Sequence, residues 1–86
     1  MSRILVPTHL RSYTQGLAAV EARGATLADV LADLDARFPG IRFRVVDEQG
    51  RIRPHVKFFV AGEQAQTLAA PVGDAAVQIV AALSGG

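Results

Sequence analysis

Residues 25–40, ATLADVLADLDARFPG, restrict the fold more than any other segment, because they form the clearest helix in the chain. The large apolar side chains of this segment recur three or four residues apart, which places them in one stripe along a helix. These residues are Leu27, Val30, Leu31, Leu34 and Phe38. One amphipathic helix covers one face of a sheet. We therefore expect a two-layer fold whose second sheet face is open to solvent or to a partner.

Both ends of this helix carry recognisable signals. Thr26 is a good N-cap residue, and Asp29 three positions later completes a short-armed capping box. Asp33 and Arg37 are four residues apart, so we expect them to pair on the solvent side. The Pro-Gly pair at 39–40 ends the helix.

Most of the remaining chain alternates apolar and polar residues with the period of two that is typical of strands. The segments with this pattern are residues 3–7, 17–22, 41–45, 56–60 and 77–82, with a short edge strand and a loop within 64–76. The pattern is weakest in residues 41–45, where Ile41, Phe43 and Val45 alternate with two arginines and suggest a strand.

The order of these elements predicts an α+β fold of the β-grasp kind. It is a roll with a mixed four- to five-stranded sheet and one main helix packed on one face. The first and last strands should lie side by side and run parallel, because the connection between them includes a helix crossover. A length of 86 residues suits one domain. We expect that domain to cover residues 1–82, followed by a flexible diglycine tail over residues 83–86.

The composition argues against several classes of function. A formal net charge of +1 does not predict a nucleic-acid or membrane-surface protein. The absence of cysteine excludes a thiolate nucleophile, a disulfide and a cysteine-ligated zinc site. The start MSRILVP is no signal peptide and no segment approaches membrane-spanning length, so a cytoplasmic protein is expected.

The sequence also contains no recognisable catalytic or cofactor-binding pattern. His9 and His55 lack carboxylate or cysteine neighbours at metal-ligand spacing. No glycine-rich motif fits a phosphate-binding loop, and the serines have no base in a recognisable motif. We therefore expect no metal, no bound cofactor and no enzyme activity.

One basic cluster leaves two interpretations open. Five cationic residues lie within residues 42–57, with three phenylalanines between or beside them. The cations are Arg42, Arg44, Arg51, Arg53 and Lys57, and the aromatic residues are Phe43, Phe58 and Phe59. Such a set is typical of a nucleic-acid surface with stacking residues. The balanced overall charge favours a solvated face or a face for an acidic partner, so a nucleic-acid partner is not expected.

The chain finishes in LSGG, and these residues are the best candidate for a reactive site. Glycine has no side chain, so Gly85 and Gly86 can thread a narrow channel. Leu83 to Gly86 would extend about 13 Å beyond the sheet. The terminal carboxylate is ionised at neutral pH and is a poor acceptor for nucleophiles. It needs activation, most simply by adenylation with ATP and Mg²⁺ on another enzyme.

Short motifs occur in a fixed order along the whole chain. They are Pro7, Leu10-Arg11, Thr14, Gly16, Gly24, Thr26, Phe38-Pro39-Gly40, DEQGRIRPHV, FVAGE and the final Gly85-Gly86. Because these motifs occur in this order, the chain resembles the ThiS/MoaD family of sulfur carrier proteins, which have a ubiquitin-like β-grasp fold. The likeness is greatest to the branch that serves cysteine synthesis.

This resemblance implies a protein cosubstrate that is not itself an enzyme. An E1-like enzyme would adenylate Gly86, using its own ATP and Mg²⁺, and sulfur would then replace the activated oxygen to give a thiocarboxylate. A sulfur-accepting synthase would receive that sulfur for cysteine or another thio-metabolite. A metalloprotease is a further candidate partner. Ser84 and Gly85 would thread the tail into these enzymes.

In the same family the exposed sheet face docks the partner proteins. The matching outward positions here are Leu5, Pro7, Phe59 and Val80, with Arg3 and Lys57 at the rim. Each of them could also be an incidental surface residue.

Several departures from the family pattern leave the pathway open. The family often has Asn where Ala61 stands, and the turn GDAAV and the end ALSGG differ from its usual forms. The small subunit of molybdopterin synthase ranks second among the carriers, because Ala81-Ala82 replaces the prolines typical of that branch. A ubiquitin-like modifier conjugated through Gly86, and a β-grasp binding module with a passive tail, are the alternatives outside the carriers.

Overall fold

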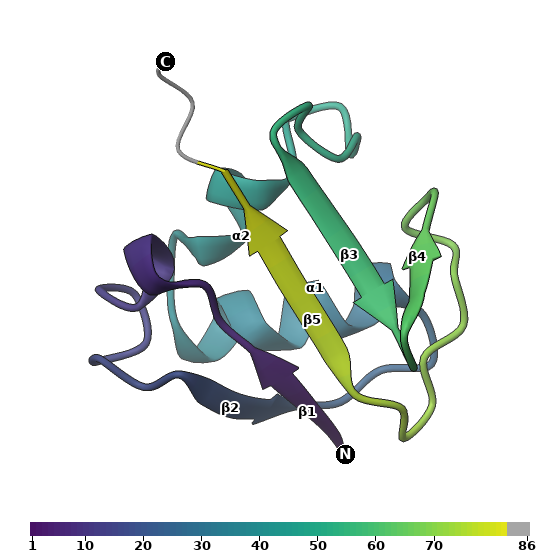
Figure 1. Cartoon of the computed structure of the whole chain (residues 1–86), viewed down its shortest axis with the longest axis horizontal. Helices are drawn as coiled ribbons and strands as arrows, with labels where there is room; N and C mark the ends of the chain where they lie inside the picture. Colours follow the sequence, from purple (N-terminus) through teal and green to yellow (C-terminus); the bar gives the residue numbers. More distant parts are fainter. Residues whose placement is uncertain (83–86) are drawn as a thin grey trace.

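The computed structural model describes residues 1–82, and within them one sheet is covered on one face by a helix (Figure 1). The strands are β1 (Ser2–Leu5), β2 (Ala19–Ala22), β3 (Val56–Val60), β4 (Glu63–Ala65) and β5 (Val77–Ala81). The helices are α1 (Leu27–Arg37) and the one-turn α2 (Ile41–Val45), with a 3₁₀ turn η1 (Thr8–Leu10). This arrangement confirms the predicted β-grasp fold.

The five strands lie in the order β2-β1-β5-β3-β4. β1 and β5 are parallel neighbours, with Ile4 opposite Val77 and Leu5 opposite Gln78. The other three pairs of neighbours are antiparallel. The first and last strands therefore lie side by side at the centre of the sheet, as the helix crossover predicted. The strands begin or end one or two residues away from some predicted bounds. Ala18, for example, lies within the predicted strand 17–22, but it is exposed and precedes β2.

Helix α1 begins and ends where its sequence signals predicted. The Thr26 hydroxyl accepts a hydrogen bond from the Asp29 amide, and the Asp29 carboxylate accepts one from the Thr26 amide. Both halves of the capping box are therefore formed. Asp33 and Arg37 pair at 3.4 Å. The apolar stripe of α1 is fully buried against the sheet, except for Phe38, which is half-buried at the C-cap.

The core lies between α1 and the inner face of the sheet. Ile4, Phe58 and Val77 contribute fully buried side chains from the three central strands. Two polar side chains, Ser2 and Thr14, are buried with them. Both are hydrogen-bonded, because Ser2 Oγ donates to the Gly73 carbonyl at 2.8 Å and Thr14 Oγ1 donates to the Leu17 carbonyl at 2.8 Å. The core is therefore apolar, with its few polar groups satisfied.

The strand suggested for residues 41–45 is wrong, because this segment forms the short helix α2. Gly40 turns the chain with φ of 99°, and the Asp35 carboxylate accepts hydrogen bonds from the amides of Gly40 and Arg42. In a helix, positions four apart share a face, so Ile41 and Val45 are both fully buried. Phe43 points the other way and is 58% exposed. The alternation with arginine therefore reflects one turn of helix.

Candidate functional site

The predicted reactive residues Ser84, Gly85 and Gly86 lie outside the described residues. The structure does describe the segment that leads to them. β5 runs antiparallel to β3, with Ala81 opposite Val56, and the Ala82 amide donates to the His55 carbonyl at 3.0 Å. The chain is thus held to β3 as far as residue 82. The end of β5 lies at the same end of the molecule as α2 (Figure 1).

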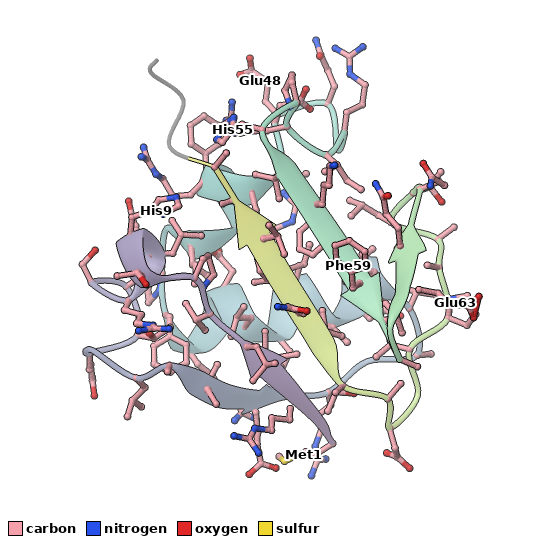
Figure 2. All side chains as sticks on the ribbon, viewed as in Figure 1. Met1, His9, Glu48, His55, Phe59 and Glu63 are labelled. Carbon is pink, nitrogen blue, oxygen red and sulfur yellow. The ribbon has the colours of Figure 1, made fainter. Side chains whose placement is uncertain are left out.

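The sheet face opposite α1 carries the predicted docking residues. Leu5 and Val80 are 36% and 39% exposed, and Phe59 is half-buried on the outer side of β3 (Figure 2). Arg3 and Lys57 are exposed on the same face. Their neighbours in sequence point into the core, as alternation along a strand requires. We name this surface the open face and define it by Arg3, Leu5, Lys57, Phe59, Gln78 and Val80.

The strand register decides which of these residues are neighbours. Gln78 is opposite both Leu5 on β1 and Phe59 on β3. Lys57 is opposite Val80. Gln78 therefore lies at the centre of the open face, although it was not among the predicted docking residues. The alternation along β5 places Gln78 outward, but its central position follows only from the pairing of β5 with both β1 and β3.

An open groove of about 630 Å³ lies beside the open face, between the segment after β1 and the end of β5. Leu5, Pro7 and Val80 line it together, and it extends to His9 and Ala81. Phe59, Lys57 and Arg3 do not line it. The structure thus brings three of the six predicted docking residues to one hollow next to the end of β5.

The wall of this groove is shaped by local bonds in residues 6–17. Arg11 Nε donates to the Val6 carbonyl at 3.0 Å and closes the turn that contains η1. Leu10 and Thr14, which belong to the same segment, are buried. Gly16 has φ of 83°, a conformation that suits glycine. Residues 6–17 therefore form one wall of the groove, and their backbone is tied to the end of β1.

The predicted basic cluster is divided among three surroundings. Phe58 is fully buried in the core, and Phe59 belongs to the open face. Phe43 remains on α2, where the Arg53 guanidinium stacks on its ring at 4.6 Å. Arg53 Nε also donates to the Phe43 carbonyl at 2.8 Å. A continuous set of stacking aromatic residues is therefore not formed, which disfavours the nucleic-acid interpretation.

The turn between α2 and β3 is centred on Asp47, whose carboxylate has a shifted pKa. The Asp47 carboxylate accepts a hydrogen bond from the Arg51 amide at 2.9 Å and a second from the Gln49 amide at 2.9 Å. Chiefly through the bond from Arg51, these contacts hold the pKa of Asp47 below its ordinary value. Arg51 Nε also lies 3.5 Å from the carboxylate. Asp47 thus stabilises a turn.

Two further observations concern the part of the chain that the structure describes. No group of three or more His, Asp or Glu side chains among residues 1–82 could hold a metal ion. None of the helices in this range has the length and apolar character needed to cross a membrane.

Comparisons with known proteins give consistent results. No family model matches the chain. It is 35% identical over 89 aligned residues to the sulfur carrier protein CysO of Mycobacterium tuberculosis and of Mycobacterium bovis, and the match covers 96% of each chain. Among solved structures, it matches the Amycolatopsis orientalis BexX/CysO complex with a TM-score of 0.91 and 32% identity, covering 100% of both chains.

Two more solved structures share the fold. Mycobacterium tuberculosis CysO matches with a TM-score of 0.86 and 30% identity, covering 96% of this chain and 100% of that one. The small archaeal modifier protein 1 of Methanosarcina acetivorans matches with a TM-score of 0.79 at 19% identity, covering 99% and 95%. At that identity the archaeal protein supports the fold alone.

Proposed function

The chain belongs to the CysO family of sulfur carrier proteins, and from that premise we propose that it carries sulfur as a thiocarboxylate on Gly86. The observation that carries this proposal is the match to CysO at 35% identity over 96% of the chain. The fold supports it, because β5 brings the last described residues out at the edge of the open face. The sulfur would serve cysteine or another thio-metabolite.

The chemistry requires two steps on partner proteins. A carboxylate resists nucleophiles, so an E1-like enzyme first transfers AMP from its ATP to the Gly86 carboxylate and releases pyrophosphate, with Mg²⁺ balancing the phosphate charge. A sulfur nucleophile then attacks the acyl carbon, and AMP leaves with one of the original oxygens. If the nucleophile is hydrosulfide, this gives the thiocarboxylate directly. If it is a persulfide, this gives an acyl disulfide, and a thiol must reduce its S–S bond to release the thiocarboxylate. A sulfur-accepting synthase bonds the sulfur to its own substrate, and water then displaces the sulfur from the acyl carbon and restores the carboxylate.

The domain contributes recognition to this sequence of reactions. The open face and the groove beside it present apolar side chains with a cationic rim, which suits a protein partner. That CysO of Amycolatopsis orientalis forms a complex with BexX supports a protein partner for this chain as well. The tail, with Ser84 and Gly85 before the reactive residue, enters the partner's active site while the open face is held.

Intact-mass spectrometry tests the proposal directly. The chain is incubated with the E1-like enzyme encoded in the same genome, ATP, Mg²⁺ and a sulfur donor. We expect the mass to rise by the difference between one sulfur and one oxygen atom. Deletion of Gly86 and omission of ATP are the controls, and both should leave the mass unchanged. An unaltered mass for the intact chain under all conditions would reject the proposal.

A second measurement distinguishes a sulfur carrier from a ubiquitin-like modifier. A modifier forms isopeptide bonds, so covalent adducts between Gly86 and lysines of other proteins would resist reductant. Recovery of such adducts from cells, without any thiocarboxylate, would favour conjugation over sulfur transfer.

A further inference from the structure

We propose that a basic patch beside the end of β5 binds an acidic surface on the E1-like partner and accelerates its association with this chain. The patch consists of Phe43, Arg44, Arg53 and Lys57, and we call it the end patch. The inference rests on the proposed function for the identity of the partner. It adds to that function a second, positively charged contact surface, which adjoins the open face at Lys57.

The charge of the chain is strongly uneven along the sequence. Residues 41–57 contain five of the nine cationic residues and two of the eight acidic residues, a net charge of +3. The rest of the chain therefore keeps four cationic and six acidic residues, a net charge of −2. The formal net charge of +1 for the whole chain conceals this separation. A separation of this kind orients a protein in the field of a charged partner.

Residues 41–57, the positive segment, lie at the end of the sheet where β5 ends. The Ala82 amide donates to the His55 carbonyl at 3.0 Å. His55 lines a small hollow of about 220 Å³ together with Phe43, Arg44 and Arg53. Figure 2 shows His55 close to the end of β5. Lys57 lies opposite Val80 on the neighbouring strand and joins this region to the open face.

The cations of the end patch are not neutralised by the acids of the described part of the chain. Three ion pairs occur among residues 1–82, and Arg51 is the one cation of residues 41–57 that takes part in them, through Asp47. Arg53 is held instead by its stacking on Phe43 and by its bond to the Phe43 carbonyl. Because this contact already holds the guanidinium in place, the Arg53 side chain loses little further conformational entropy when a partner binds. The end patch is thus a preorganised positive surface.

An acidic protein surface fits the end patch better than a nucleic acid does. Arginine and aromatic residues are enriched at protein interfaces, and here Arg53 and the 58% exposed Phe43 are in contact. Single-stranded nucleic acid requires several stacking rings along a cationic groove. Of the three phenylalanines in this region, Phe58 is in the core and Phe59 is on the open face.

The test measures association of the unmodified chain with the E1-like enzyme of the same genome, without ATP, by stopped-flow or surface-based kinetics. We expect Arg44→Glu with Arg53→Glu to lower the association rate constant about tenfold at low salt. High salt should reduce this difference, because exposed charges are screened. Arg44→Glu alone, which leaves the Arg53–Phe43 contact intact, should give a smaller fall in the same direction.

Arg23→Glu is the matched control, because Arg23 is exposed and follows β2 at the opposite end of the sheet, where Ser2 pairs with Ala22. It should leave the rate constant within about twofold of the wild type. Equal rate constants for the end-patch and control variants, or no binding of the wild type, would overturn the inference. So would tight binding of a single-stranded oligonucleotide that the double variant loses.

The mass measurement separates the two proposals. If the rate constant depends on the end patch but the mass never changes, the patch is supported and the thiocarboxylate chemistry fails. If the mass changes equally fast for the wild type and the double variant at limiting enzyme, the chemistry is supported and the end patch is rejected.

Discussion

Gly24 lies where the fold has no room for a side chain. The residue joins β2 to α1, and a Cβ atom built on it would lie 2.5 Å from the Val30 amide nitrogen and 2.6 Å from Asp29 Cβ. Both atoms belong to the first turns of α1, which is fixed by the capping box and by its buried stripe. Glycine is therefore required here by the close approach of helix and loop.

Replacement of Gly24 by alanine should cost about 1–3 kcal/mol of the free energy of unfolding, because the helix must shift to admit one methyl group. Urea denaturation measures this cost. Gly50→Ala is the control, since its Cβ would meet nothing within 4 Å and only its φ of 78° is unfavourable. The explanation fails if Gly24→Ala is no more destabilising than Gly50→Ala.

Individual residues differ in how well the sequence predicts their roles. Thr26, Asp29, Asp33 and Arg37 were assigned correctly, because their partners lie three or four positions away on the same helix. Asp35 was not assigned a role, although its carboxylate binds the amides of Gly40 and Arg42. Its bonds depend on the left-handed Gly40, which a pattern of spacing does not reveal.

At the scale of elements, β2 is an edge strand whose outward polar groups are partly covered by α1. The Val6 amide bonds to the Ala18 carbonyl, so in the antiparallel register Glu21 points its carbonyl away from β1. Arg37 Nη1 donates to that carbonyl at 3.3 Å, and the Arg23 amide donates to Asp33 Oδ2 at 2.9 Å. The Asp33–Arg37 pair therefore closes part of this edge.

Removal of this cover should make the edge available for strand pairing between molecules. We expect the Asp33→Ala, Arg37→Ala double variant to form dimers or larger species at concentrations where the wild type does not. The loss of stability should stay within about 1 kcal/mol, because the pair is partly exposed. Sedimentation velocity measures the self-association.

Arg51→Ala provides the comparison for the edge variant, because it breaks the other pair of this spacing, with Asp47, in a turn away from β2. Association of this variant to the same degree would show that the edge of β2 is not the cause. A monomeric double variant would contradict the idea outright.

For the whole molecule, the decisive feature is that one face of the sheet is buried beneath α1 and the other is exposed. Adjacent residues on β3 illustrate this, since Phe58 is fully buried beneath α1 and Phe59 lies on the open face. A phenylalanine in the core contributes to stability through burial. On our proposal, a phenylalanine on the open face contributes instead to the binding of a partner protein.

We expect Phe58→Ala to cost about 3–5 kcal/mol of the free energy of unfolding, and Phe59→Ala to cost less than about half of that. Phe59→Ala should instead weaken binding to the E1-like enzyme while the chain remains folded. Thermal denaturation and a binding titration on the same preparations measure the two effects. Similar stability losses with unchanged binding would argue against a division of tasks between the faces.

The sequence by itself determined the helix, four of the strands by their alternation and the β-grasp order, because these depend on periodicity and on neighbours within a few residues. It also indicated which positions of each strand face outward. The carrier function followed from the order of short motifs, and the prediction for Ser84, Gly85 and Gly86 lies outside the described residues.

The tertiary structure alone decided three further points. It made residues 41–45 a helix, because the Asp35 caps and the burial of Ile41 and Val45 outweigh the alternation. It placed Gln78 at the centre of the open face through its two strand partners. It placed Arg44 and Arg53 near the end of β5, which follows them by about 30 to 40 residues in the chain. These contacts depend on strand register and on packing across the sheet, which local patterns do not contain.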